Sequence, residues 1–348
     1  MLRKIKVIVV DDSALMRKII SDMINSETEM EVIDTARNGE ELLSKITLEK
    51  PDIITLDIEM SKMDGIETLG QLQKKNINIP VIMLSSVSKT GTELTMECLQ
   101  LGAFDFIAKP SGSISLEFNK VKNELVQKIK LAFTRRQVIN KGIEKKNNLA
   151  IAHTTNTGAH SIEAIVIAAS TGGPKALYKV ITELPKNLGV PVLVVQHMPT
   201  GFTKAFAQRL NVNSEIMVVE AQDGDTVEKN VVYIAPGGFH MEIGIDKRIH
   251  LNTEPTLWGV RPCADKLFLS ATKVYGPRLL SVILTGMGRD GANGTVAIKD
   301  NGGITIAEHK STCIIYGMPK AAFETGKVDE IIPLSDIAER ISEILAGR

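Results

Sequence analysis

The chain has 348 residues, of which 43% are hydrophobic, and its 41 lysine and arginine residues balance 41 aspartate and glutamate residues. This length predicts about two globular domains, each with enough apolar residues for a core. A neutral chain has no overall attraction for nucleic acid, and no apolar run approaches the roughly 20 residues that span a bilayer. We therefore expect a cytoplasmic protein that binds no nucleic acid and is not inserted in a membrane.

The first part of the chain alternates apolar strands with amphipathic helices. The predicted strands are residues 5–10, 31–35, 52–56, 81–84 and 105–108. Five such units predict an α/β domain over residues 1–133, built on a doubly wound parallel sheet. Helical spacing over residues 120–136 closes it. The polar residues 134–160 have little apolar periodicity, and we interpret them as a linker in which His153 and His160 are exposed.

Polar side chains follow the ends of these strands. Asp11 and Asp12 follow the first, Asp57 the third, Ser85 the fourth and Lys109 the fifth. Each could simply cap a helix or face solvent, but parallel strands bring all five to one edge of the sheet. Three carboxylates repel one another unless a hard cation joins them, which predicts a Mg²⁺ site. Asp57 could then accept a phosphoryl group, with its charge neutralised by Mg²⁺ and Lys109 and an oxygen bound by the Ser85 hydroxyl.

Residues 4–133 resemble a response-regulator receiver domain. The resemblance implies a flavodoxin-like fold, Mg²⁺ held by Asp11, Asp12 and Asp57, and phosphorylation of Asp57 by a histidine kinase or a small phosphodonor. It also identifies Lys109-Pro110 with the family's Lys-Pro pair, Ser85 with its switch hydroxyl and Phe106 with its aromatic switch position.

The second part of the chain is organised around an apolar strand over residues 165–169 that ends at Ser170-Thr-Gly-Gly-Pro174. Apolar residues then recur at helical spacing, so Ser170 lies where a strand passes into a helix N-terminus. Backbone N–H groups there can bind an oxyanion or a phosphate. The pattern is similar to a nucleophile elbow, although Ala168 replaces its first glycine. The simpler interpretation is that Ser170 caps the helix.

Further strands are predicted at residues 191–196, 216–220, 231–235, 279–284, 304–307 and 328–332, with a hairpin over 241–249. Helices are expected near residues 202, 263–274, 318–325 and 337–345. These units predict a second doubly wound domain over residues 161–348, Rossmann-like and mainly parallel, with a few antiparallel strands. Cys98, Cys263 and Cys313 are odd in number and lack metal-ligand spacing, so we expect buried free thiols.

His197 and Asp290 also follow separate predicted strands. A serine needs an imidazole to take its proton, and a carboxylate fixes the tautomer of that imidazole. Ser170, His197 and Asp290 therefore predict a catalytic triad for acyl hydrolysis. Taken singly, His197 could be structural and Asp290 could cap the next helix.

Two other functions compete with the triad. Gly286-x-Gly288-x-x-Gly291 follows a strand and Glu308 follows the next one, as in a dinucleotide-binding oxidoreductase. That hypothesis leaves Ser170 and His197 unexplained. The second competing function is that of a non-enzymatic effector, which would only bind partners or DNA when phosphorylated. The neutral charge of the chain and the lack of a recognition-helix motif disfavour this function.

The motifs Ala169-Ser-Thr-Gly-Gly-Pro174, Gln196-His-Met-Pro199 and Leu284-Thr-Gly-Met-Gly-Arg-Asp-Gly-Ala292, behind a receiver domain, resemble the chemotaxis protein-glutamate methylesterases. The resemblance implies hydrolysis of glutamate methyl esters on methyl-accepting chemoreceptors, deamidation of receptor glutamines, and control by phosphorylation. It places the catalytic residues at Ser170, His197 and Asp290, with Thr171 and Met287 lining the site and no cofactor for the esterase step. It assigns no role to Arg289.

Overall fold

The computed structural model describes residues 3–109, 115–140 and 161–347. The chain divides into two compact units, Met1–Lys145 and Lys146–Arg348. The predicted positions of Pro110, His153 and His160, and most of the predicted linker, lie outside the described residues. Among the described residues, none of the helices combines the length and the apolar character that a bilayer crossing requires.

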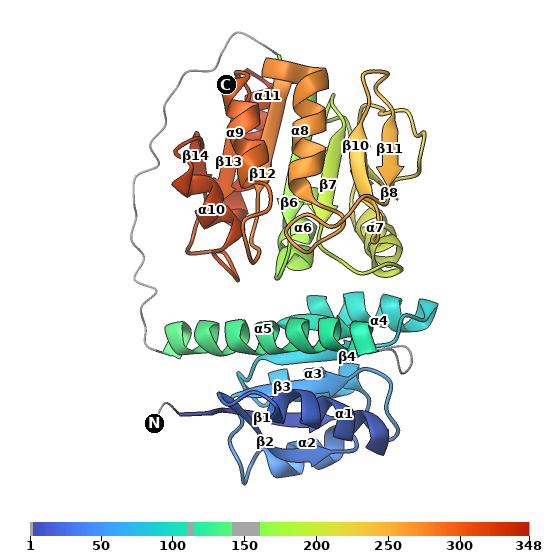
Figure 1. The fold of residues 1–348 in the computed structure, drawn as a ribbon, viewed down its shortest axis with the longest axis vertical. Coiled ribbons are helices and arrows are strands. Elements are labelled where there is room, and N and C mark those ends of the chain that lie inside the picture. Colours follow the sequence, from blue (N-terminus) through green and yellow to red (C-terminus); the bar gives the residue numbers. More distant parts are fainter. Residues whose placement is uncertain (1–2, 110–114, 141–160, 348) are drawn as a thin grey trace. The chain divides into compact units, whose positions relative to one another are not determined.

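The first unit is a five-stranded parallel sheet with the order β2-β1-β3-β4-β5, as expected for a doubly wound domain (Figure 1). Its strands are β1 (Ile5–Val10), β2 (Met30–Ala36), β3 (Ile53–Asp57), β4 (Val81–Ser85) and β5 (Asp105–Ala108). Its helices are α1 (Ala14–Asn25), α2 (Gly39–Lys45), α3 (Gly65–Lys74), α4 (Lys89–Gln100) and α5 (Ser115–Asn140). Helix α5 continues beyond residue 136, where the sequence pattern of the helix ends.

Local sequence explains where these helices begin. The Ser13 hydroxyl accepts a hydrogen bond from the backbone N–H of Met16 at the start of α1. Asp64 and Glu67 form a reciprocal capping box at the start of α3. Because Ser13 and Asp64 cap these helices, Asp11, Asp12 and Asp57 are not needed as caps. The alternative interpretation of the three aspartates as helix caps is therefore wrong.

The second unit contains a seven-stranded sheet in which every pair of neighbours is parallel, with the order β14-β13-β12-β6-β7-β9-β8 (Figure 1). Its strands are β6 (Ala164–Ala169), β7 (Val192–Gln196), β8 (Met217–Glu220), β9 (Val231–Ile234), β12 (Leu279–Ile283), β13 (Ile304–Glu308) and β14 (Glu330–Ile332). The antiparallel strands that we expected are confined to a separate two-stranded sheet, β10 (His240–Ile243) and β11 (Ile249–Asn252).

Helices cover both faces of this sheet. Its helices are α6 (Gly173–Thr182), α7 (Phe202–Asn213), α8 (Ala264–Tyr275), α9 (Ala292–Asp300), α10 (Met318–Glu324) and α11 (Ile337–Leu345). Helices α8, α9 and α10 share one buried apolar cluster with inward-facing residues of β6 and β7. Helix α6 contacts α7 and α11. Figure 1 shows α8 and α9 side by side in front of the sheet.

Both sheets have a point where the strand order reverses. In the first unit β1 lies between β2 and β3, and in the second β6 lies between β12 and β7. Helices on either side of such a point leave opposite faces of the sheet, which opens a crevice at the carboxyl ends of the strands. Asp11 and Asp57 lie at the first of these points, and Ser170 lies at the second.

Helix α9 packs closely against α8 at Gly294. A Cβ added there would overlap with Phe268 in α8 and lie 2.9 Å from its Cδ2. Replacing a helical glycine with alanine usually stabilises a protein by about 0.5–1 kcal/mol. We expect Gly294→Ala to destabilise the second unit instead, by about 1–3 kcal/mol. Gly70→Ala in α3 is the matched control, since a Cβ there meets nothing within 4 Å. Urea unfolding of both variants would contradict the packing if Gly294→Ala were as stabilising as Gly70→Ala.

Candidate functional site

Ser170 directly follows β6, and its backbone N–H donates to the carbonyl of Thr285 (3.0 Å) in the loop after β12. The N-cap of α6 is Gly172, in a left-handed conformation (φ +77°), and no side chain caps this helix. Ser170 is therefore not the helix cap, and the alternative interpretation of this residue is wrong. Its hydroxyl stays at a strand end, at the reversal point of the sheet.

His197 follows β7, the strand next to β6, and its backbone N–H donates to Ala169 O (3.0 Å). The register pairs Ala169 with Gln196, so Ser170 and His197 are neighbours at the carboxyl edge. The imidazole Nε2 lies 2.7 Å from Asp290 Oδ2, and the two side chains are only 10% and 2% exposed. The structure thus pairs His197 with Asp290 and places Ser170 at the end of the neighbouring strand, while the role of the three residues as a triad stays a prediction.

Asp290 accepts three hydrogen bonds besides the one from His197. The donors are the thiol of Cys263 (3.0 Å) and the backbone N–H groups of Ala264 (2.6 Å) and Asp265 (2.9 Å). Asp290 therefore caps α8 rather than the helix that follows it, α9, whose N-cap is Gly291. Burial opposes ionisation, but these bonds and the neighbouring His197 hold the pKa of Asp290 below its ordinary value.

The glycines of the site allow close approach of its segments. A Cβ on Gly286 would lie 2.8 Å from Cβ of Ser170, and one on Gly173 would overlap with the amide oxygen of Gln196. Gln196 is buried, and its Nε2 donates to the carbonyls of both Ser170 and His197 (3.0 Å each). This amide links the nucleophile's turn to the histidine's turn.

The dinucleotide hypothesis fails on Glu308. This residue is fully buried, and its carboxylate accepts a hydrogen bond from the backbone N–H of Thr285 (2.8 Å), so it supports the loop instead of facing a ribose. The carbonyl of Gly286 accepts from the backbone N–H groups of Gly317 and Met318, at the start of α10. Of the three glycines in the pattern, Gly286 lies against Ser170, and Gly291 is the left-handed N-cap of α9 (φ +88°).

Thr171 is buried and Met287 is exposed beside the Ser170 turn. Within the described part of the chain, neither backbone N–H group donates a hydrogen bond to another residue. Both groups are therefore available to a ligand, and two N–H donors beside a nucleophile are what an oxyanion needs. Their identity as the oxyanion hole stays a prediction.

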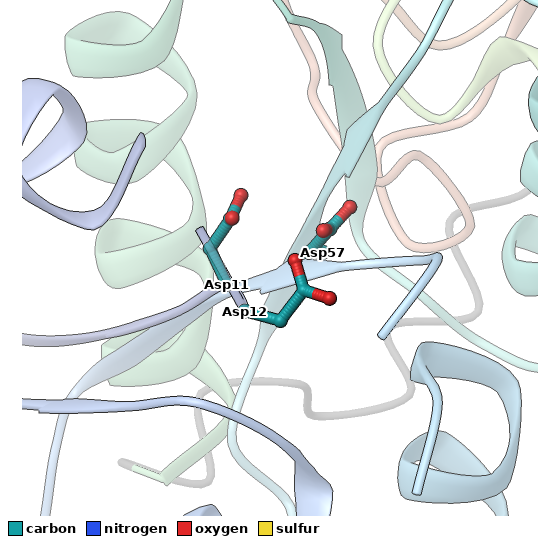
Figure 2. A group of neighbouring side chains, drawn as sticks. All are labelled: Asp11, Asp12 and Asp57. Carbon is teal, nitrogen blue, oxygen red and sulfur yellow. The ribbon is translucent and has the colours of Figure 1, made fainter. Parts of the chain in front are cut away.

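A second cluster occupies the reversal point of the first unit. Lys109 Nζ lies 2.8 Å from Asp11 Oδ2 and 2.7 Å from Asp57 Oδ2, and the two carboxylates are buried. Asp12 is exposed beside them, and the three aspartates offer oxygens within 4.8 Å of one another. Figure 2 shows Asp11 and Asp12 extending from the end of β1 and Asp57 from its neighbour β3. Lys109 is thus an ion-pair partner of both buried acids, not a solvated lysine.

This cluster fits a small divalent cation. Burial, opposed by the hydrogen bond from Lys109, raises the pKa of Asp57 to about 6. Burial would lower the pKa of Lys109, but its bonds to Asp11 and Asp57 raise it. Three carboxylates with one ammonium leave an excess of negative charge, and oxygen-only ligands with one exposed side suit Mg²⁺ with retained waters.

Comparison with known proteins identifies the family. Residues 165–341 match the family model described as CheB methylesterase, and residues 7–117 match the response regulator receiver domain. A protein-glutamate methylesterase/protein-glutamine glutaminase from Clostridium acetobutylicum is 57% identical to this chain over 99% of both. The chain belongs to the CheB methylesterase family. A protein of the same name from Pyrococcus abyssi is 46% identical, over 97% of this chain and 93% of its own.

The fold of the second unit also agrees with a solved member of the CheB methylesterase family. The crystal structure of the Thermotoga maritima CheB methylesterase catalytic domain aligns with a TM-score of 0.51 and 43% identity. It covers 53% of this chain and 100% of that one. The predicted combination of two α/β units with mainly parallel sheets is confirmed.

Ser85 and Phe106, the two predicted switch positions, are both buried. The Ser85 hydroxyl lies 2.6 Å from Thr95 Oγ1 and donates to Gly91 O (3.2 Å), so it is engaged with α4. The Phe106 ring is covered by Lys128 of α5, whose Nζ lies 5.3 Å from the ring centre. Lys128 also pairs with Asp105 (3.2 Å). Ser85 is therefore bonded to α4 and Phe106 packs against α5, and their role as switches stays a prediction.

Sequence reasoning missed several residues of this CheB methylesterase site. The three cysteines are buried thiols outside any disulfide, as predicted, but the sequence did not indicate that Cys263 donates to Asp290. Burial and the nearby Asp290 raise the pKa of the Cys263 thiol, which keeps it protonated as a donor. Asp265 and Gln196 were also missed as site residues, because their contacts to Asp290 and Ser170 lie 25 and 26 residues away in the sequence. Thr95, which contacts Ser85 in the first unit, was missed as well.

The raised pKa of Asp57 yields a prediction about stability. Its folded value of about 6 lies above the ordinary carboxyl value of 3.8, so ionised Asp57 destabilises the first unit at pH 7, and the penalty fades as the pH falls from about 6 toward 4. Without Mg²⁺, we expect Asp57→Asn to raise the free energy of unfolding by about 1–3 kcal/mol at pH 7 and by about half as much at pH 5.

Urea unfolding in a chelating buffer measures this effect. Asp22→Asn, which removes an exposed aspartate paired with Lys18 in α1, should change little at either pH and serves as the control. Destabilisation by Asp57→Asn at pH 7 would contradict the account, because the pair with Lys109 would then outweigh the cost of burial.

Proposed function

We propose that this chain hydrolyses glutamate methyl esters on chemoreceptors, and deamidates receptor glutamines, with Ser170, His197 and Asp290 as the catalytic residues. The hydrogen bond between His197 and Asp290, next to a serine that caps no helix, carries the proposal. The relatives named protein-glutamate methylesterase/protein-glutamine glutaminase support the substrate class. The same proposal places the protein in the cytoplasm, where receptor glutamates and a histidine kinase would meet it.

The mechanism begins with the Ser170 hydroxyl. Asp290 holds the Nε2–H of His197, which leaves Nδ1 to take the proton from Ser170 as its oxygen attacks the ester carbonyl. The backbone N–H groups of Thr171 and Met287 stabilise the resulting oxyanion. His197 then gives the proton to the departing methoxide. Methanol is released, and the glutamyl group stays bound to Ser170 as an acyl-enzyme.

Water completes the reaction. His197 takes a proton from water as the water oxygen attacks the acyl-enzyme, and it then gives that proton to the Ser170 oxygen as the bond to the acyl group breaks. The product leaves as the glutamic acid side chain, which releases its proton to solvent. With a glutamine substrate, the first leaving group is ammonia instead of methanol. Asp290 stays ionised throughout, in agreement with its lowered pKa.

The first test is methanol release from methylated receptor. We expect Ser170→Ala and His197→Ala each to lower the rate by at least about 10³-fold. Asp290→Asn should lower it by about 10²–10⁴-fold, because the imidazole is no longer held in the tautomer that can accept the serine proton. His250→Ala is the matched control, since His250 forms an exposed pair with Asp246 (3.2 Å) elsewhere in the same unit. Full activity in a correctly folded Ser170→Ala protein would refute the assignment.

We further propose that the first unit controls the second through phosphorylation of Asp57. Asp11, Asp12 and Asp57 would hold Mg²⁺, which supplies positive charge for the transferred phosphoryl group. Lys109 lies within 2.7 Å of Asp57 and would neutralise a further phosphoryl oxygen. The Ser85 hydroxyl would leave Thr95 and Gly91 to bind the phosphoryl group, and Phe106 would move with it.

This control has its own test. A small phosphodonor with Mg²⁺ should add one phosphate to the chain and raise methanol release severalfold. If phosphorylation destabilises an inhibited state by about 1–2 kcal/mol, the fraction of active molecules rises severalfold or more. Asp57→Ala should abolish both effects, whereas Asp22→Asn should preserve them. A fragment of residues 161–348 should be at least as fast as the unphosphorylated chain. Activation of Asp57→Ala by the phosphodonor would refute the proposal.

A further inference from the structure

Arg289 precedes the catalytic Asp290, and the sequence motifs give it no role. Its side chain is exposed, and its guanidinium lies over the ring of Trp258, 5.0 Å from the ring centre. Within the described residues, Arg289 forms no ion pair and donates no hydrogen bond to another residue. A guanidinium stacked on an aromatic ring keeps its N–H donors free at its edge while losing rotational freedom.

Trp258 is itself held in an unusual position. Its backbone is left-handed (φ +55°), a conformation that costs a bulky residue energy and that marks functional positions more often than others. The indole Nε1–H donates to Asp265 Oδ2 (2.9 Å). The guanidinium of Arg261 fixes the start of the same loop by donating to the carbonyls of Thr253 (2.7 Å) and Glu254 (2.8 Å).

The ring that supports Arg289 is thereby connected to the triad. Asp265, which accepts from Trp258, donates its own backbone N–H to Asp290 (2.9 Å). The Asp265 carboxylate also accepts a hydrogen bond from the backbone N–H of Gly294 (2.8 Å). The Asp290 carboxylate accepts from His197 and Cys263. Arg289 is therefore a cation stacked on Trp258 beside the triad, and the carboxylates of Asp265 and Asp290 are bonded to other donors.

We propose that Arg289, positioned by Trp258, binds a carboxylate of the protein substrate that flanks the glutamate side chain being hydrolysed. This inference rests on the proposed function. The methyl ester and the glutamine amide are neutral, so neither supplies a charge partner for a guanidinium. A protein whose modified residues are glutamates carries carboxylates, and an arginine fork binds a carboxylate through two parallel hydrogen bonds.

A pair of substrates tests the proposal. Both are chemoreceptor fragments with a single methylated glutamate, and they differ only in having glutamate or glutamine at the neighbouring acidic positions. Wild type should hydrolyse the acidic fragment with a kcat/KM about tenfold higher, the size of one charge-assisted interaction. The preference should shrink in high salt because the contact is exposed.

Arg289→Gln should remove this preference and leave kcat/KM for the neutral fragment within about twofold. Lys186→Gln is the matched control: it removes one exposed positive charge from the segment that leads into β7, at the opposite edge of the sheet, and should keep the preference. Equal losses on both fragments in Arg289→Gln would overturn the proposal, because they would indicate a structural role. Hydrolysis of neither fragment by wild type would overturn the proposed function as well.

Variants of Trp258 separate positioning from folding. Trp258→Leu removes both the ring under Arg289 and the indole donor to Asp265 Oδ2, but Asp265 keeps the hydrogen bond from Gly294 N–H and its own backbone bond to Asp290. It should therefore raise KM for the acidic fragment alone and leave kcat on the neutral fragment nearly unchanged. Trp258→Phe keeps an aromatic face and should retain part of the preference. A fall in kcat on both fragments with unchanged relative KM would assign Trp258 to the support of Asp265 and would overturn its role under Arg289.

Discussion

The carboxylate of Asp290 is the constraint on which the second unit depends. It receives the imidazole of His197, the thiol of Cys263 and two backbone N–H groups from the first turn of α8. The positive end of a helix stabilises a buried negative charge, so α8 keeps Asp290 ionised while Asp290 fixes the start of α8. Through these bonds the histidine, the α8 terminus and the loop after β12 form one rigid assembly.

The two units use the same architectural solution for different chemistry. Each places its site where the strand order reverses, so that neighbouring strands deliver side chains into one crevice. In the first unit the crevice gathers three carboxylates around Lys109, an arrangement suited to a cation and a phosphoryl group. In the second it presents a hydroxyl, an imidazole and free N–H donors, which suit acyl transfer.

The sequence is sufficient to predict the site residues that directly follow a strand. Asp57, Ser170 and His197 follow apolar runs, and parallel strands share a carboxyl edge, so their convergence can be inferred without coordinates. Contacts made by the entry into α8 cannot be inferred in this way. Cys263 reads as a buried thiol, but its bond to Asp290 depends on how α8 packs beside α9. The all-parallel order of the main sheet likewise depends on tertiary packing, whereas the β10–β11 pair agrees with the hairpin predicted over residues 241–249.

We infer that Asp290 selects the tautomer of His197 in which Nε2 carries the proton and Nδ1 is free to accept the proton of Ser170. Nitrogen NMR of the ¹⁵N-labelled full chain, with His197 assigned by comparison with His197→Gln, measures this directly. We expect a protonated Nε2 and an unprotonated Nδ1 at neutral pH, with the Nε2 signal displaced in Asp290→Asn. A proton on Nδ1, or a His197 spectrum that Asp290→Asn leaves unchanged, would contradict this inference.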